Sequence, residues 1–271
     1  MNLPEKFSLK NKLAVVTGGG GLLGKQFLQA LEQAGAFVVA LDVNRTKLEE
    51  AADQVGTESV EYLQADITDA ASIRSAVEEI VRVHNRLDIL VNSAAVDPKF
   101  DPDQVEHRPR TSFVDYPLED WKRSLDVNLT GMFLSCQAAV RPMLQNGGGV
   151  IINLSSMYGL VGPDQRLYRR EGERPRYKPV DYSVTKAGVL GLTRYLAAFY
   201  GRKGIRVNAL TPGGVFNDHD EEFIQRYSSR AILGRMAEFD ELNGALLFLA
   251  SEASSYMTGA NLIVDGGWTA W

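Results

Sequence analysis

The 271-residue chain has little cysteine, little histidine and no long apolar run. Cys136 is the only cysteine, which excludes an intrachain disulfide, so we expect a reducing, cytoplasmic location. The three histidines lack metal-ligand spacing, and we expect no metal site. No apolar stretch reaches the length of a membrane span, and the N-terminus lacks the apolar core of a signal peptide. Positive charge is not in excess either, because the net charge is −5, so we expect no nucleic-acid partner.

What the chain does contain is a regular alternation of short β-branched runs and longer helical patterns. Strands are predicted over 13–16, 36–41, 60–65, 87–92, 149–154, 205–210 and 260–264. Helices are predicted over 69–84, 118–145, 218–230 and 241–250, and one is predicted from Tyr182 onward. This alternation predicts an α/β fold. We expect a single Rossmann-like catalytic domain over residues 1–271, with a doubly wound parallel sheet of about seven strands and helices on both faces.

Tyr182 and Lys186 are four residues apart and would share one face of their helix. A lysine ammonium beside a phenol favours the phenolate and would lower the phenol's pKa. Tyr182 could then act as a general acid and base toward a hydroxyl or carbonyl. Taken alone, the spacing is common, and an amphipathic helix that happens to carry both residues explains it more simply.

A glycine-rich turn follows the first predicted strand, with Gly18, Gly21 and Gly24 just before a helical pattern. Strand, turn and helix in this order open a dinucleotide-binding unit, where glycines let the backbone approach a pyrophosphate. Asp42 ends the second strand, where a carboxylate would accept from both ribose hydroxyls and repel a 2′-phosphate. The pattern therefore favours NAD over NADP, although Arg45 follows three residues later.

Two further residues stand where a ligand could use them. Asn128 interrupts the long helical pattern, either to bind something or as a satisfied core amide. Ser156 follows the fifth strand, where it could bind a substrate oxygen or simply cap the strand.

Two polar excursions, 97–116 and 163–181, break the alternation. The second carries arginines at 166, 169, 170, 174 and 176 together with Lys178. A solvated loop would explain it, and so would an anionic or polyhydroxylated substrate. Trp268 and Trp271 near the C-terminus suggest burial in another subunit, so we expect a homodimer or homotetramer.

Taken together, the motifs resemble the short-chain dehydrogenase/reductase family from about Leu13 to Gly267. The resemblance rests on their order along the chain: the glycine turn, Asp42, Asp66, Asn92-Ser93-Ala94-Ala95, Asn128, Ser156, Tyr182-x-x-x-Lys186, Pro212-Gly213 and Asp265-Gly266-Gly267.

The resemblance implies an NAD(H)-dependent oxidoreductase that moves a hydride between nicotinamide and a secondary alcohol or ketone. It assigns proton transfer to Tyr182 and orientation of the substrate oxygen to Ser156. Lys186 would hold the nicotinamide ribose, and Asn128 would place a relay water. The implied cofactor contacts are Gly18, Gly21, Leu22, Leu23, Asp42, Asp66, Ile67, Asn92, Tyr182, Lys186, Pro212, Gly213 and Val215.

Three departures from the family pattern bear on the substrate. Leu22 stands where a glycine is usual, Asn92 is followed by Ser-Ala-Ala, and 26 residues separate Ser156 from Tyr182. The glycine turn and the Arg-rich insert look like those of family members that act in surface-glycan or nonulosonic-acid sugar biosynthesis. We therefore expect a small polar substrate, such as a sugar or phosphorylated sugar. The alternatives are a cofactor-retaining sugar-nucleotide epimerase or dehydratase, and a non-catalytic NAD-sensing protein.

Overall fold

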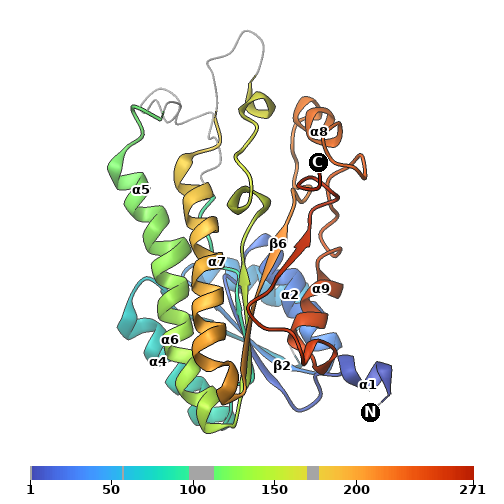
Figure 1. Ribbon diagram of the computed structural model, residues 1–271. Helices are drawn as coiled ribbons and strands as arrows, with labels where there is room; N and C mark the ends of the chain where they lie inside the picture. The colour runs from blue at the N-terminus through green and yellow to red at the C-terminus, as the bar shows by residue number, and fades with distance from the viewer. Residues whose placement is uncertain (1, 57, 98–112, 170–176) are drawn as a thin grey trace.

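A seven-stranded parallel sheet forms the centre of the protein, as the alternating pattern predicts (Figure 1). The computed structural model describes residues 2–56, 58–97, 113–169 and 177–271. The strands are β1 (Leu13–Thr17), β2 (Phe37–Asp42), β3 (Val60–Gln64), β4 (Ile89–Asn92), β5 (Gly149–Leu154), β6 (Ile205–Pro212) and β7 (Asn261–Val264), in the order β3-β2-β1-β4-β5-β6-β7. Every neighbouring pair is parallel, so all the carboxyl ends meet at one edge.

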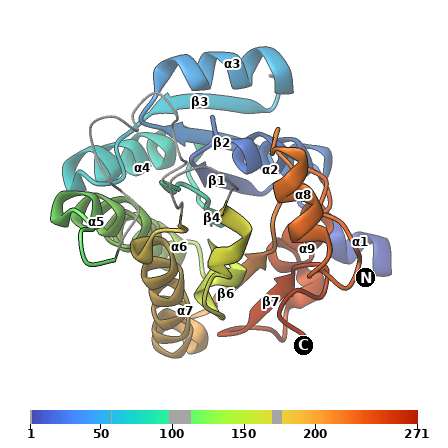
Figure 2. The ribbon, with the colours of Figure 1, turned by 90° about the horizontal axis from the view of Figure 1, so that it is seen from above.

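Helices cover both faces of this sheet (Figure 2). One face carries α4 (Ala70–His84), α6 (Met132–Gln145) and α7 (Val180–Tyr200), and the other carries α2 (Leu22–Gln33), α3 (Arg45–Val55) and α9 (Asn243–Ala250). Two short helices lie near the carboxyl edge of the sheet (Figure 1). α8 (Glu221–Ser228) stands beyond this edge, and α5 (Leu118–Leu125) runs from its side down toward α6. Because both faces are covered, central strands are apolar throughout, and all five residues of β1 are buried.

The long helix predicted over 118–145 is present, but a π-helical turn interrupts it. This turn, η2 (Asp126–Gly131), joins α5 to α6. Gly131 is needed there because a Cβ atom would lie 2.7 Å from the side chain of Ile67. Single π-helical turns are often found at functional sites, so the unusual Asn and Gly mark a local change of helix type.

Two details differ from the sequence-based expectations. The polar N-terminal segment forms a short helix, α1 (Leu3–Phe7), with a capping box between Asn2 and Glu5. Trp268 is not an exposed terminal tryptophan, since it stacks on Tyr227 at 4.5 Å between ring centroids and is buried within its own chain. Of the two terminal tryptophans only Trp271 is exposed, so one side chain and not two supports the predicted oligomer.

Candidate active site

The carboxyl edge of the sheet gathers the residues that the sequence analysis selects. They follow or end successive strands: Gly18 after β1, Asp42 in β2, Asp66 after β3, Asn92 in β4, Ser156 after β5 and Gly213 after β6. Open α/β sheets bind ligands in the crevice outside the carboxyl ends of their strands. The helix α7 brings Tyr182 and Lys186 to the same edge.

The Ser156 hydroxyl lies close enough to Tyr182 to lower the pKa of its phenol, although 26 residues separate the two in the chain. The described part of the intervening excursion bulges outward and includes a short 3₁₀ turn, Gln165–Tyr168. A second contact fixes α7 to the end of β5, because the Ser155 hydroxyl donates to the carbonyl of Lys186 at 2.8 Å. The excursion therefore leaves the Ser-Tyr pair together, as the resemblance required.

Lys186 is buried beside the strand end, and its Nζ donates to the carbonyl oxygen of Leu154 at 2.9 Å. The same Nζ lies 5.8 Å from the centroid of the Tyr182 ring. Lysine and tyrosine thus share a helix face, one turn apart, as their spacing predicts.

The electrostatics of this pair differ from the simple expectation. Burial, followed by the negative charge of Asp97, raises the pKa of Tyr182, and its hydrogen bond with Ser156 opposes that change only in part. Burial also lowers the pKa of Lys186 to about 8. The expected depression of the phenol pKa by Lys186 is therefore wrong, because desolvation is the largest effect on Tyr182 and Lys186 is not among the groups that lower its pKa.

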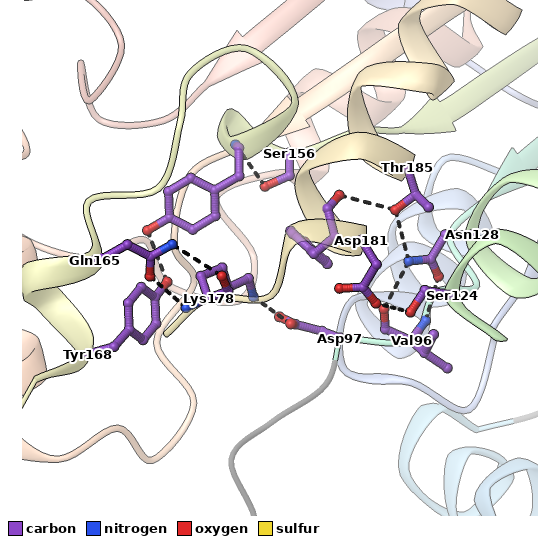
Figure 3. A network of polar contacts seen from close by, with 12 residues as sticks. Val96, Asp97, Ser124, Asn128, Ser156, Gln165, Tyr168, Lys178, Asp181 and Thr185 are labelled. Atoms are coloured by element: carbon purple, nitrogen blue, oxygen red, sulfur yellow. Dashed lines mark hydrogen bonds and ion pairs between the residues drawn. The ribbon is translucent and has the colours of Figure 1, made fainter. Parts of the chain in front are cut away.

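Asn128 lies in the π-helical turn, fully buried, and its amide makes three hydrogen bonds (Figure 3). Oδ1 accepts from the backbone N–H of Val96 at 2.7 Å, and Nδ2 donates to the Val96 carbonyl at 3.0 Å. Nδ2 also lies 3.3 Å from Oγ1 of Thr185, the residue before Lys186. Asn128 therefore joins the chain after β4 to the catalytic helix.

A second buried contact holds α7 at its first turn. The carboxylate of Asp181, directly before Tyr182, is fully buried and accepts from the Ser124 hydroxyl of α5 (Figure 3). The first turn of α7 is thus fixed from the α5 side as well as from β5.

Lys178 and Asp97 also face Tyr182, and neither was selected from the sequence as a single residue. Lys178 Nζ lies 3.9 Å from the Tyr182 ring centroid and forms an ion pair with Asp97 (Figure 3). The signal that could have found them is position, since Lys178 precedes Tyr182 by one helical turn and Asp97 is five residues beyond β4.

The glycine turn after β1 packs too tightly to admit side chains. Gly18 has φ +69°, and a Cβ there would lie 2.7 Å from the backbone of Ala94. A Cβ at Gly24 would lie 2.0 Å from the Gly18 carbonyl oxygen. Gly21 is the N-cap of α2, so the N–H groups of Leu22 and Leu23 stand in its first turn without intrahelical acceptors. This is the geometry that favours an anion such as a pyrophosphate.

Asp42 is fixed at the end of β2 next to this turn. One carboxylate oxygen accepts from Gly20 N–H at 3.2 Å and the other from Asn44 N–H at 3.0 Å. Arg45 does not compensate this charge, because its guanidinium pairs with Glu49 one helical turn along α3 at 3.0 Å. The two carboxylate oxygens of Asp42 can accept further hydrogen bonds.

Asp66 and Ile67 follow β3 as predicted. The Asp66 carboxylate accepts from the N–H and hydroxyl of Thr68 at 2.8 and 2.7 Å, which fixes the turn, while Ile67 is buried against η2. The Asn92 side chain points into the core, where Nδ2 donates to Asn153 at 2.8 Å and its Oδ1 has no partner.

The end of β6 forms the remaining border. Gly213 N–H donates to Val264 at 2.9 Å, next to Pro212, and Val215 forms a β-bridge with Ala237. Among the described residues, no three His, Cys, Asp or Glu side chains come together as metal ligands. Within the same part of the chain, no helix is both long and apolar enough to cross a membrane.

Comparison with known proteins agrees with this architecture. A family model described as enoyl-(acyl carrier protein) reductase matches residues 22–269. The D-threitol dehydrogenase of Mycolicibacterium smegmatis is 34% identical over 97% of this chain and 95% of its own. A 3-alpha-(or 20-beta)-hydroxysteroid dehydrogenase of Mycobacterium tuberculosis is 36% identical over 97% of this chain and 91% of its own.

Solved structures give the same result. The gluconate 5-dehydrogenase of Burkholderia cenocepacia, in complex with NADP and tartrate, has a TM-score of 0.82 and 31% identity, with full coverage of both chains. A short-chain dehydrogenase of Leptospira borgpetersenii with bound NAD+ has a TM-score of 0.82 and 33% identity, covering 99% of this chain and 96% of its own.

The parallel sheet with its glycine turn and its Ser-Tyr-Lys cluster defines a nicotinamide-dependent oxidoreductase of the Rossmann type. The chain belongs to the short-chain dehydrogenase/reductase family. As a member it acts on secondary alcohols or the corresponding ketones.

Proposed function

We propose that the protein uses NAD(H) to interconvert a secondary alcohol and a ketone on a small polyhydroxylated substrate. The observation that carries the proposal is the convergence of Ser156, Tyr182 and Lys186 at the sheet edge that also holds the glycine turn. A polar substrate is supported by the names of two similar proteins, a D-threitol dehydrogenase and a gluconate 5-dehydrogenase. The hydroxysteroid dehydrogenase is the reason to test an apolar alcohol beside the polyols.

The residues divide the proton chemistry between them. In the oxidation direction Tyr182 accepts the substrate hydroxyl proton, and Ser156 donates a hydrogen bond to the same oxygen. Lys186 would hold the cofactor's ribose, while Asn128 keeps the helix and the loop after β4 in register. A nicotinamide bound at this edge would supply the acceptor for the hydride of the carbinol carbon.

The residues present fit a dinucleotide. The glycine turn is a cradle that a single Cβ would fill, and the first turn of α2 presents N–H groups to it. Asn92 ends the adjoining strand, where its side chain points into the core and joins β4 to β5. Asp66 and Ile67 would border the adenine, and Pro212, Gly213 and Val215 would border the nicotinamide.

NAD is proposed over NADP because of Asp42. Its carboxylate lies beside the turn, no cation of the described residues forms an ion pair with it, and Arg45 is engaged by Glu49. A 2′-phosphate would meet a fixed negative charge there, whereas ribose hydroxyls would find an acceptor. Two further expectations stay predictions from the sequence: that residues 1–271 form one catalytic domain, and that the protein is cytoplasmic.

The function is tested by following NADH formation with threitol, gluconate, xylitol and a hydroxysteroid. Tyr182→Phe should reduce kcat at least about 100-fold while NADH still binds, because general acid–base catalysis contributes that much. Tyr195→Phe is the matched control, since Tyr195 is an exposed tyrosine on the same helix. NAD binding without turnover of any alcohol would refute the proposal and favour an NAD-sensing protein.

The cofactor preference is tested separately. Asp42→Ala should lower the ratio of kcat/KM for NAD over NADP by about 10- to 100-fold, because hydrogen bonds to a charged group are lost. Asp53→Ala, an exposed acidic position on α3, should leave the ratio unchanged. A wild type that prefers NADP would contradict the role given to Asp42.

A further inference from the structure

Tyr182 is flanked by an ion pair that the chemistry described above does not use. Lys178 lies over its ring, 3.9 Å from the centroid, and 5.9 Å from the ring of Tyr158. The Lys178 side chain is only 11% exposed, whereas that of its partner Asp97 is 42% exposed. Lys178 and Asp97 therefore place one charge of each sign beside the candidate general acid, and the carboxylate is the more exposed of the two. Figure 3 shows the ion pair.

Both charged residues are held by dedicated backbone contacts. Gln165 clamps Lys178 from both sides, since its Oε1 accepts from Lys178 N–H at 2.8 Å and its Nε2 donates to the Lys178 carbonyl at 3.2 Å. Asp97 follows Val96, whose N–H and carbonyl are both bound by Asn128. Two segments that are 81 residues apart are thus fixed so that their charges meet over Tyr182.

A second described cation of this excursion is also paired. Arg166 pairs with Asp164 at 2.8 Å, and Asp164 also pairs with Arg230 near α8. At the ring of Tyr182 itself, the Lys178 ammonium is matched by the Asp97 carboxylate. A matched pair favours a neutral group that both donates and accepts hydrogen bonds over a phosphate or carboxylate.

We propose that Lys178 and Asp97 form the specificity pair of the enzyme, which binds the hydroxyl on the carbon next to the reacting one and so selects vicinal diols. The inference rests on the proposed function and adds the substrate class and the residues that recognise it. A hydroxyl can accept from the Lys178 ammonium and donate to the Asp97 carboxylate at the same time. An isolated alcohol offers nothing to either charge.

The reach of the pair agrees with this geometry. A substrate hydroxyl bound to the Tyr182 phenol lies about 2.7 Å from its oxygen. The hydroxyl on the neighbouring carbon is then displaced toward the ring face, where Lys178 Nζ lies. The pair changes neither the bond that breaks nor the path of the hydride, so it is a positioning device and not part of proton transfer.

The experiment compares two alcohols of equal chain length, butane-2,3-diol and butan-2-ol, with threitol as a four-carbon polyol that also carries vicinal hydroxyls. We measure kcat/KM for the wild type, Lys178→Met, Asp97→Asn and the double variant. The wild type should prefer the diol, and each single variant, compared at its own pH optimum, should lose about 10- to 100-fold on the diols while changing little on butan-2-ol. The double variant should lose less than the product of the single losses, because one hydroxyl bridges both groups.

Lys203→Met is the matched control, since Lys203 also lies over an aromatic ring, Phe199 at 4.9 Å, at the far end of α7. Thermal unfolding and NADH binding of each variant report whether the pair is merely structural. Equal losses on diol and monoalcohol would overturn the specificity pair and leave the proposed function standing. A wild type that turns over no alcohol would overturn the proposed function and this inference with it.

Discussion

The side-chain amide of Asn128 binds both backbone polar groups of Val96, accepting from its N–H at 2.7 Å and donating to its carbonyl at 3.0 Å. The amide comes from the π-helical turn, and Val96 belongs to the chain that leaves β4. The pair of hydrogen bonds resembles the pair that two neighbouring strands exchange, although here a helix side chain binds a loop. It fixes the loop directly before Asp97.

Asn128→Ala should therefore destabilise the protein beyond the loss of one hydrogen bond. Two partly buried backbone groups of Val96 would lose their partners, and we expect the free energy of unfolding to fall by about 1–3 kcal/mol. Urea titration measures this change, and kcat should fall as the loop shifts. Asn146→Ala, at the exposed C-cap of α6, should change the stability by less than about 0.5 kcal/mol. Equal effects at the two positions would contradict the role of the contact.

Asp97→Asn should move the pH profile of oxidation to lower pH. Burial raises the pKa of Tyr182 first, and the Asp97 charge raises it further. Removing that charge lowers the pKa, so the phenolate that accepts the substrate proton forms at lower pH. The measurement is kcat/KM for butan-2-ol against pH, with Asp53→Asn as the control. A profile that moves to higher pH would refute the assignment.

Lys186 makes the stability of the fold depend on pH. Burial lowers its pKa to about 8, below the ordinary lysine value of about 10.4. Between these values the unfolded chain binds a proton that the folded chain does not, so stability rises with pH and is lost as the pH falls toward 8. From pH 7 to pH 10 the wild type should gain about 2–3 kcal/mol relative to Lys186→Met. When the wild type is compared with the exposed control Lys203→Met, we expect no such gain in stability between pH 7 and pH 10.

Gly24→Ala should disrupt the cofactor cradle, because the new methyl group would lie 2.0 Å from the carbonyl oxygen of Gly18. We expect a destabilisation of about 2–3 kcal/mol and a weaker affinity for NADH, measured by its fluorescence. Gly191→Ala is the matched control, since nothing lies within 4 Å of a Cβ there. In α7 that change should stabilise the protein by about 0.5–1 kcal/mol. Unchanged NADH affinity in Gly24→Ala would show that the turn does not hold the cofactor.

The sheet could be predicted because buried parallel strands leave apolar runs that end in turn residues. β1, β4 and β5 lie within two residues of their predicted ranges, and the glycine turn falls where its pattern places it. The Ser156–Tyr182 contact could be predicted only through the family resemblance, since nothing local indicates how far the excursion between them bulges.

The remainder depends on long-range packing. The burial of Trp268 against Tyr227 and the contact of Lys178 with Asp97 join segments whose distance in space no local pattern encodes. The pKa of Tyr182 depends on how much water the fold removes from it, which a spacing of four residues cannot report. Arg170, Arg174, Arg176 and most of the first excursion lie outside the described residues.

The only thiol of the protein is inaccessible to thiol-modifying reagents. Cys136 is 1% exposed between α6 and the sheet, and burial raises its pKa to about 12, so almost no thiolate exists at neutral pH. A cysteine introduced at an exposed position would then be the single group that a maleimide dye labels. The wild-type background therefore suits fluorescence reporters of ligand binding without first removing a native thiol.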